Sequence, residues 1–289
     1  MKIRNLELEN KYFLAPMAEI NDIAFRTLCK KAGASLCYTG MINPLTQQEL
    51  ELSDKPAVQL FCTNENGIRD FIKKYDGGTS LWDFNLGCPA KTARKLEFGS
   101  FMHHKLEDVE KILRVMREST EKPLTLKLRK SKNILKIIKI ASKYCDAICV
   151  HPRTSEQGYS GKADVDYALR IKKKIKLPVI YSGDVNLDNV KKLEKQFNFL
   201  MIARSAIGNP DIFAKLTNNE IRYGFEDWLK LAHKHELHYS QIKLQAMNFT
   251  KGKENGKEMR RKLILAKTVR EIKEIYGLKF TPLSKNKGP

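Results

Sequence analysis

Short apolar runs recur along the chain as far as residue 203, and they set the pattern that predicts the fold. Most contain β-branched or aromatic residues, and each is shorter than an ordinary helix. Continuous apolar runs of this kind are typical of strands that are buried on both faces of a sheet. They predict strands at residues 12–15, 35–39, 57–61, 81–84, 124–128, 147–150, 178–181 and 199–203.

Between these runs, apolar residues recur at helical spacing. Such stripes cover residues 24–32, 109–116, 134–141 and 190–197, and the first is followed by Gly33, a residue type favoured just beyond a helix end. Strands that alternate with helices predict an α/β protein with a parallel sheet. Eight such strands predict a (β/α)8 barrel of the TIM type, which we place at residues 1–216.

The main competitor is a doubly wound sheet with a nucleotide site at its first turn. That fold favours a glycine-rich turn after the first strand, where main-chain N–H groups approach a phosphate. Here the first strand is followed by Ala15-Pro16-Met17-Ala18-Glu19, which contains no glycine. The barrel is therefore the favoured prediction.

The pattern changes near residue 217, where strand signals stop. Long charged helical stretches follow at residues 225–244 and 258–276, with a glycine-containing loop at 251–256 between them. From residue 217 to the end there are 16 Lys and Arg against 8 Asp and Glu. We predict a small, basic helical domain at residues 217–280 and a disordered tail at 281–289.

Composition adds one strong signal, a formal net charge of +20. A charge of this size favours a polyanionic partner, with nucleic acid first and an anionic membrane second. The alternative is a lysine-rich surface that is simply solvated, since the lysines are spread throughout the chain.

Other compositional features indicate a cytoplasmic protein. No apolar run approaches the length of a membrane span, and the first residues lack the apolar stretch of a secretory signal. The six cysteines show no disulfide or zinc spacing, so we expect reduced thiols and no structural metal. Nothing indicates an obligate protein partner.

Candidate chemistry follows the predicted strands. Cys88 stands between Gly87 and Pro89 at the end of one strand, where a thiol is poorly placed for packing and well placed to face a site. Other polar groups follow later strands, in the segments Lys127-Leu128-Arg129, His151-Pro152-Arg153-Thr154, Ser182-Gly183-Asp184 and Ala203-Arg204. The carboxyl ends of barrel strands meet on one face, so these groups predict a single active site.

The last two of these segments also predict a phosphate site. In barrels, phosphate usually sits near the loops after strands seven and eight. Gly183 lets main-chain N–H groups approach a phosphate, and Arg204 adds a forked donor.

Taken in order, these motifs resemble those of the tRNA-dihydrouridine synthases. The resemblance covers residues 1–215, and beyond them extends only to helical character and the basic run Arg260-Arg261-Lys262. The segments that carry it are Leu14-Ala15-Pro16-Met17, Phe25-Arg26, Val58-Gln59-Leu60, Asn85-Leu86-Gly87-Cys88-Pro89, Lys127-Leu128-Arg129, His151-Pro152-Arg153-Thr154, Gly183-Asp184, Ile202-Ala203-Arg204 and Gly208-Asn209-Pro210.

The resemblance implies an FMN enzyme that reduces the C5–C6 bond of uridine in tRNA, with NADPH as reductant. A hydride from the flavin must reach one ring carbon, and a proton must reach the other from the opposite face. Cys88 would donate that proton, and Lys127 would stabilise the anionic reduced flavin. By resemblance and position, we expect FMN to be bound by Ala15, Pro16, Met17, Gln59, Lys127, His151, Ser182, Gly183, Asp184, Ala203 and Arg204.

The substrate would be held by a second set of residues. Asn85 would hold the uracil edge, and Arg129 and Arg153 would meet phosphates or the flipped base. Arg260 and Arg261 would bind tRNA from the helical domain.

Four positions depart from the family pattern. Gly40 stands where a glutamate is common, Ser182 where an asparagine is usual, Pro152 where a small residue is usual, and Ala203 where a glycine is usual. The Cβ of Ala203 could shift the phosphate cradle, since it restricts the approach of the backbone.

Two other functions remain open at this level. The first is an FMN barrel that acts on a small pyrimidine or enone, against which the basic helical region argues. The second is a barrel that only binds RNA, against which the intact set of Cys88, Lys127, His151 and Arg204 argues.

Overall fold

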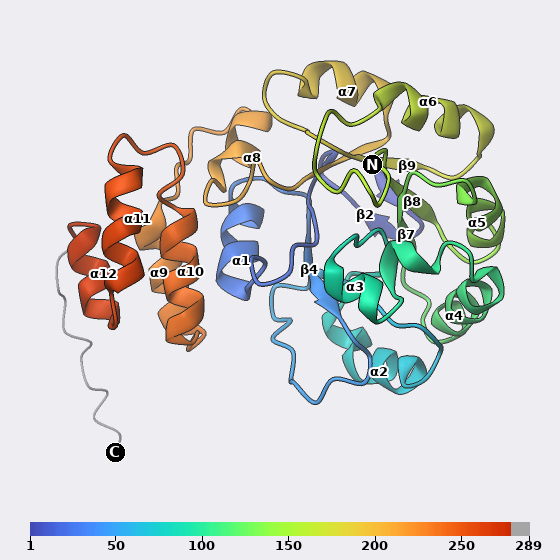
Figure 1. The fold of residues 1–289 in the computed structure, drawn as a ribbon, viewed down its shortest axis with the longest axis horizontal. Coiled ribbons are helices and arrows are strands. Elements are labelled where there is room, and N and C mark those ends of the chain that lie inside the picture. Colours follow the sequence, from blue (N-terminus) through green and yellow to red (C-terminus); the bar gives the residue numbers. More distant parts are fainter. Residues whose placement is uncertain (279–289) are drawn as a thin grey trace.

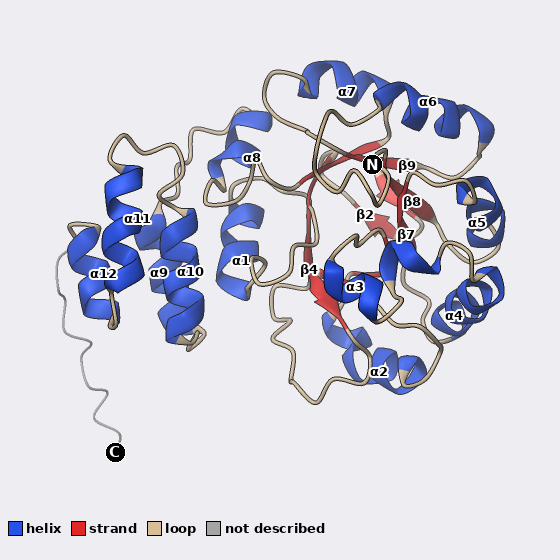
Figure 2. Cartoon of the chain, in the orientation of Figure 1, coloured by secondary structure: helices blue, strands red, loops and turns tan. Residues whose placement is uncertain are grey.

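The computed structural model describes residues 1–278, so the predicted disordered tail lies outside the described residues. Its centre is a closed barrel of parallel strands with helices on the outside (Figures 1 and 2). Each of the eight predicted strands is confirmed. In chain order they are β3 (Tyr12–Leu14), β4 (Leu36–Ile42), β5 (Ala57–Leu60), β6 (Leu81–Leu86), β7 (Leu124–Arg129), β8 (Ala147–His151), β9 (Val179–Ser182) and β10 (Phe199–Ile202).

The barrel closes between its last and first strands. β10 pairs with β3, and every other strand pairs with its neighbour in sequence. Each connection therefore returns the chain along the outside, through a helix in most cases. These helices are α1 (Ile23–Lys31), α2 (Ile68–Tyr75), α3 (Lys91–Lys95), α4 (Leu106–Glu118), α5 (Ile134–Ala141), α6 (Val165–Lys174), α7 (Val190–Gln196) and α8 (Asp211–Leu216), with short 3₁₀ turns η1 (Asp76–Gly78) and η2 (Gly99–Met102).

The first helix shows how local sequence sets these elements. Its N-cap is Asp22, whose side chain accepts a hydrogen bond from the Phe25 main-chain N–H at 2.8 Å. Its end is marked by Gly33 at φ +113°, a conformation that a side chain would strain. Both ends are therefore encoded by single residues.

The inside of the barrel is filled from one end by apolar side chains. Ile3 and Leu8 pack beneath Phe13, Leu36 and other inward-facing residues. Ile3 belongs to a two-stranded antiparallel sheet that the sequence pattern did not predict, and Leu8 follows it directly. This sheet consists of β1 (Lys2–Ile3) and β2 (Leu6–Glu7). The opposite, carboxyl end of the barrel holds the polar residues instead.

The C-terminal region is helical, but its helices are shorter than predicted. They are α9 (Phe225–Lys234), α10 (Tyr239–Asn248), α11 (Gly256–Leu265) and α12 (Val269–Ile275). The two predicted helical stretches, at 225–244 and 258–276, each correspond to two helices. Glu236 adopts φ +50°, and Ala266 leaves the helical region at ψ 133°, so each stretch divides in two.

Within this region α9 packs against α1 of the barrel (Figure 1). The half-buried Asp22 carboxylate joins the region to the barrel by accepting hydrogen bonds from Trp228, Gln241 and Gln245 at 3.1, 2.8 and 2.6 Å. Among the described helices, none has the length and apolar character needed to cross a bilayer.

Candidate active site

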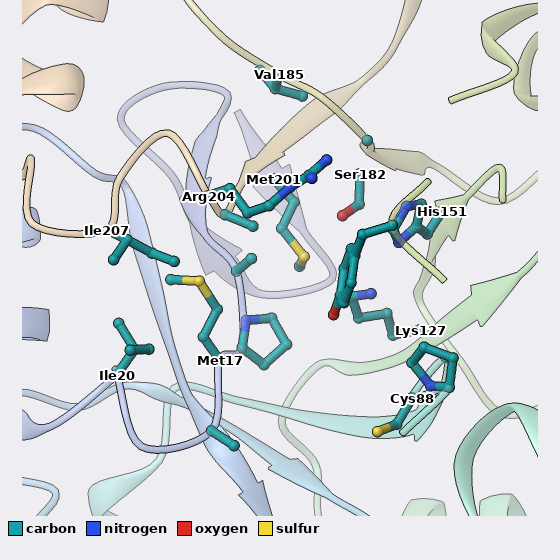
Figure 3. A pocket seen from close by; sticks show the side chains of 18 of the residues that line it. Met17, Ile20, Cys88, Lys127, His151, Ser182, Val185, Met201, Arg204 and Ile207 are labelled. Atoms are coloured by element: carbon teal, nitrogen blue, oxygen red, sulfur yellow. The ribbon is translucent and has the colours of Figure 1, made fainter. Parts of the chain in front are cut away.

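A cavity of about 790 Å³ opens at the carboxyl end of the barrel (Figure 3). All eight barrel strands, or the loops that follow them, contribute to its wall. It therefore lies where barrel active sites are found. The cavity brings together these residues that the sequence predicted: Ala15, Pro16, Met17, Gln59, Asn85, Cys88, Lys127, Arg129, His151, Ser182, Gly183, Asp184, Ala203 and Arg204.

The wall has two chemical halves. Met17, Ile20 and Ile207 lie on one side in Figure 3, and Cys88 and Lys127 lie on the other. A flat ring system between them would meet apolar groups on one side and reactive polar groups on the other.

The thiol of Cys88 faces this cavity from a tightly held loop. Its main-chain N–H donates to Asn85 Oδ1 at 2.9 Å, and its carbonyl accepts from Ser100 Oγ at 2.9 Å. Gly99, at φ +64°, packs against the same loop, since a Cβ there would lie 2.8 Å from the Cys88 carbonyl oxygen. In the described chain Cys88 is the only partly exposed cysteine, and the other five are buried.

Lys127 reaches the cavity from the neighbouring strand. It pairs in register with Asn85, so its side chain emerges beside the Cys88 loop. A Cβ on Gly87 would lie 3.5 Å from its Nζ. No carboxylate in residues 1–278 forms an ion pair with this ammonium group, so its charge remains available to a ligand.

Two side-chain amides form the floor of the cavity. Asn85 Nδ2 donates to Gln59 Oε1 at 2.7 Å, and Gln59 Nε2 donates to Asp83 Oδ2 at 2.6 Å. Asp83 is fully buried, and sequence reasoning missed it. The sequence feature that could have indicated it is a charged residue within the otherwise apolar run at residues 81–84.

His151 is held in its neutral form. Burial lowers its pKa from 6.5 to about 2, and the charges of Lys127, Arg129, Arg153 and Arg204 act in the same direction. Arg153 Nη1 lies 3.4 Å from His151 Nε2, and a guanidinium can only donate, so this ring nitrogen is the acceptor. The proton of the neutral ring is therefore on Nδ1.

Asp184 links the two loops of the expected phosphate site. It sits at φ +51° and accepts hydrogen bonds from Arg153, at 2.6 Å, and from Arg204. Burial alone would raise the pKa of Asp184, but these partners and the Ala163 main-chain N–H hold it below its usual value. The loop after β9 is thus tied to the loop after β10.

Two residues predicted to bind substrate form hydrogen bonds within the protein instead. Arg129 is 1% exposed, and it donates to the carbonyl oxygens of Gly87, Thr154 and Gly158 at 2.8–2.9 Å. Arg153 is equally buried behind the cavity wall and does not line it. Their donors are engaged by carbonyl and carboxylate groups, so we interpret both as residues that hold the loops in place rather than as phosphate ligands.

The comparison with protein families agrees with this geometry. The model of the dihydrouridine synthase (Dus) family matches residues 13–276. The chain belongs to the dihydrouridine synthase family. It is an enzyme of that family, as the resemblance predicted.

Curated relatives of this dihydrouridine synthase match over much of their length. The tRNA-dihydrouridine synthase B of Vibrio vulnificus is 31% identical over 239 residues, which are 75% of this chain and 74% of the relative. A probable tRNA-dihydrouridine synthase of Rickettsia conorii is 33% identical over 238 residues, covering 75% and 72%.

Solved structures confirm the barrel at much lower identity. TcOYE, solved with pHBA, aligns with a TM-score of 0.55 and 9% identity over 79% of this chain and 94% of its own. Histamine dehydrogenase from Rhizobium sp. 4-9 aligns with a TM-score of 0.52 and 11% identity, covering 75% and 44%. These likenesses show the fold.

Two residues of this dihydrouridine synthase complete the cavity mouth, and sequence reasoning missed both. Tyr159 is 60% exposed, and its ring centroid lies 5.4 Å from the guanidinium group of Arg129 and 5.3 Å from that of Arg204. Lys251 reaches the rim from the loop after α10 and donates to the Arg204 carbonyl at 2.6 Å. No local pattern marks either residue, because each acts through distant partners.

Arg260 and Arg261 do not join the cavity. Both lie on α11, where Arg260 Nη1 donates to Thr250 Oγ1 at 2.7 Å and Arg261 is exposed. Neither arginine is therefore placed to contact a group bound in the cavity. No cluster of three or more metal-ligating side chains occurs in the described residues.

Proposed function

We propose that this protein reduces uridine in tRNA to 5,6-dihydrouridine, with bound FMN supplying the hydride and NADPH restoring the reduced flavin. Residues 1–216 form the catalytic barrel in this proposal, and residues 217–280 bind tRNA. Cys88 is the proton donor. The proposal rests on one observation above all, that the partly exposed thiol of Cys88 and the unpaired ammonium group of Lys127 share a wall of one cavity.

The cavity residues fit FMN. Four cationic side chains line the cavity, from Lys127, Arg129, Arg204 and Lys251, against the single carboxylate of Asp184. This balance suits a phosphate and an anionic ring, to which Arg129 would contribute its charge and not a direct hydrogen bond.

The expected contacts to FMN follow from this arrangement. Arg204 and the main chain at Gly183 would hold the phosphate, while Gln59 and Lys127 would hold the pyrimidine edge. The Nδ1–H of His151 adds a donor near the same edge. Ala15, Pro16, Met17, Ser182 and Ala203 complete the surface around the ring.

The protein's own part of the reaction is then a proton transfer with charge stabilisation. Cys88 Sγ–H gives its proton to the uracil carbon that does not receive hydride. Lys127 stabilises negative charge next to the reacting groups, and no carboxylate competes for it. Met17 and Ile20 exclude water from the opposite side.

The helical region supports tRNA as the substrate. It carries twice as many basic as acidic residues, and Lys251 brings part of this charge to the rim of the cavity. A uridine must leave its stack to reach so enclosed a site, and cationic groups at the rim would hold the flanking phosphates.

The test is to replace the proton donor without touching the fold. Cys88→Ala should keep FMN and tRNA binding and flavin reduction by NADPH, yet slow reduction of tRNA uridine by roughly 10²–10⁴-fold, the usual share of a positioned acid. Cys62→Ala is the matched control, because that thiol is buried and does not line the cavity.

The two half-reactions are measured separately by flavin absorbance and by dihydrouridine formation in a single turnover. Near-normal dihydrouridine formation in the Cys88 variant would remove the proton-donor role. Protein purified without flavin, or with no reductase activity on tRNA, would overturn the wider proposal.

A further inference from the structure

Asp83 lies at the centre of the barrel, beneath the cavity rather than in its wall. It is 0% exposed, and both carboxylate oxygens are used. One accepts from Thr125 Oγ1 and the other from Gln59 Nε2. A buried carboxylate carries a large desolvation cost, so its presence inside the barrel indicates a structural or functional role.

From Asp83, a continuous chain of hydrogen bonds leads to the loop of the reactive cysteine. Gln59 donates to Asp83 and accepts from Asn85, and Asn85 Oδ1 then accepts the main-chain N–H groups of both Gly87 and Cys88 at 2.9 Å. All four links lie between 2.6 and 2.9 Å.

The direction of this chain is fixed at its two ends. A carboxylate accepts, so Gln59 must turn its NH₂ group toward Asp83 and its oxygen toward Asn85. The main-chain N–H groups of Gly87 and Cys88 can only donate, so Asn85 must turn its oxygen toward them. Neither amide can be flipped without placing donor against donor or acceptor against acceptor.

We propose that Asp83 is a positioning residue for Cys88, acting through the side-chain amides of Gln59 and Asn85. Its acceptor oxygen sets the orientation of both amides and thereby holds the main chain at residues 87 and 88. Its effect on turnover rests on the proposed proton-donor function of Cys88, whereas its effect on the loop does not.

The surroundings of Asp83 support a role that depends on an acceptor. Burial raises the pKa of Asp83 from 3.8 to about 6, while hydrogen bonds from Gln59 and Thr125 and the charge of Lys127 oppose that rise. Either protonation state keeps an acceptor oxygen for Gln59. What the chain requires is this oxygen, and an apolar side chain of similar size would not supply it.

The experiment compares three variants of the flavin-loaded enzyme. Asp83→Leu removes the acceptor. Asp83→Asn keeps an acceptor oxygen for Gln59 and can turn its NH₂ group to the Thr125 hydroxyl. Thr125→Val is the matched control, because it removes the other hydrogen bond on Asp83 and leaves the chain to Cys88 intact.

The first readout requires no RNA. Hydrogen exchange at the amides of residues 87 and 88 should become faster in Asp83→Leu. The alkylation rate of the Cys88 thiol should also change relative to wild type. Asp83→Asn and Thr125→Val should match wild type in both measurements. If Asp83→Leu fails to fold, Gln59→Met breaks the same chain one link closer to Asn85 and must give the same change in exchange.

The second readout is single-turnover reduction of tRNA uridine by pre-reduced enzyme. A displaced donor should slow this step roughly 100-fold in Asp83→Leu, and Asp83→Asn should restore it. Unchanged exchange at residues 87 and 88 in Asp83→Leu would overturn the proposal, as would equal losses in Asp83→Leu and Thr125→Val. Changed exchange with an unchanged single-turnover rate would leave the loop effect standing and remove Cys88 as donor.

Discussion

Lys251 donates a hydrogen bond from its Nζ to the main-chain oxygen of Arg204, 2.6 Å away. This contact joins the loop after α10 to the loop after β10, which the sequence predicts as a phosphate site. The two residues are far apart in sequence, and both line the cavity. The helical region thus contributes directly to the rim through which a substrate must pass.

Lys251→Met should therefore weaken tRNA binding and reduce its salt dependence. One lost phosphate contact lowers the slope of log affinity against log salt by about one. Binding is measured at several salt concentrations. Lys191→Met is the control, since Lys191 is an exposed lysine on α7 that does not line the cavity. Equal slopes for wild type and Lys251→Met would contradict this placement.

Arg204→Ala should weaken the retention of FMN by roughly 1.5–3 kcal/mol, the range for a hydrogen bond to a charged group. Its guanidinium is half exposed at the cavity and shares Asp184 with Arg153. Flavin dissociation constants measured by fluorescence test this expectation. Arg170→Ala, on the outer face of α6, should have no effect. Full flavin retention in Arg204→Ala would exclude this arginine from the phosphate site.

His151 should make the flavin-free protein sensitive to acid. Its pKa in the folded state lies below the unfolded value of 6.5, so below pH 6.5 the unfolded chain binds the extra proton. The stabilising effect of neutral His151 is complete above pH 6.5 and is lost as the pH falls. Between pH 7 and pH 5, wild type should lose up to about 2 kcal/mol more unfolding free energy than His151→Gln.

Urea unfolding of both proteins at the two pH values measures this difference. Other titrating groups are common to both proteins and cancel. Identical pH dependence in the two proteins would show that His151 is not held neutral in the fold.

Asp22→Ala should destabilise the contact between the barrel and the helical region. The substitution removes a helix N-cap, worth about 1 kcal/mol, and removes one acceptor from each of Trp228, Gln241 and Gln245. The two glutamines keep a second acceptor, the carbonyl oxygens of Glu19 and Ile20, but one N–H of each loses its partner. Each buried donor that is left unsatisfied costs about 1–3 kcal/mol. The total loss in unfolding free energy should therefore clearly exceed that of a cap alone.

Asp164→Ala provides the matched control. Asp164 caps α6 in the same way, accepting from the Tyr167 main-chain N–H at 2.9 Å, but it does not contact the C-terminal helices. It should lose about 1 kcal/mol for the cap, and at most about 1 kcal/mol more for its partly exposed ion pair with Lys130. Equal losses in the two variants, measured by urea unfolding, would mean that Asp22 acts only as a cap.

The sequence by itself determined the barrel and many of the residues that line its cavity. Short, doubly apolar runs indicate parallel strands wherever they occur, and the carboxyl ends of such strands must share one face, so Cys88, Lys127, His151 and Arg204 could be placed together without coordinates. The glycine at position 33 was an equally local signal.

Only the tertiary structure decided what depends on distant partners. Arg129 and Arg153 look like substrate ligands in sequence, yet carbonyl groups from neighbouring loops surround them and use their donors. Asp83 becomes significant because three strands place Gln59, Asn85 and Thr125 around it. A residue's type and spacing show what it can bind, whereas its burial and the groups packed against it decide what it does bind.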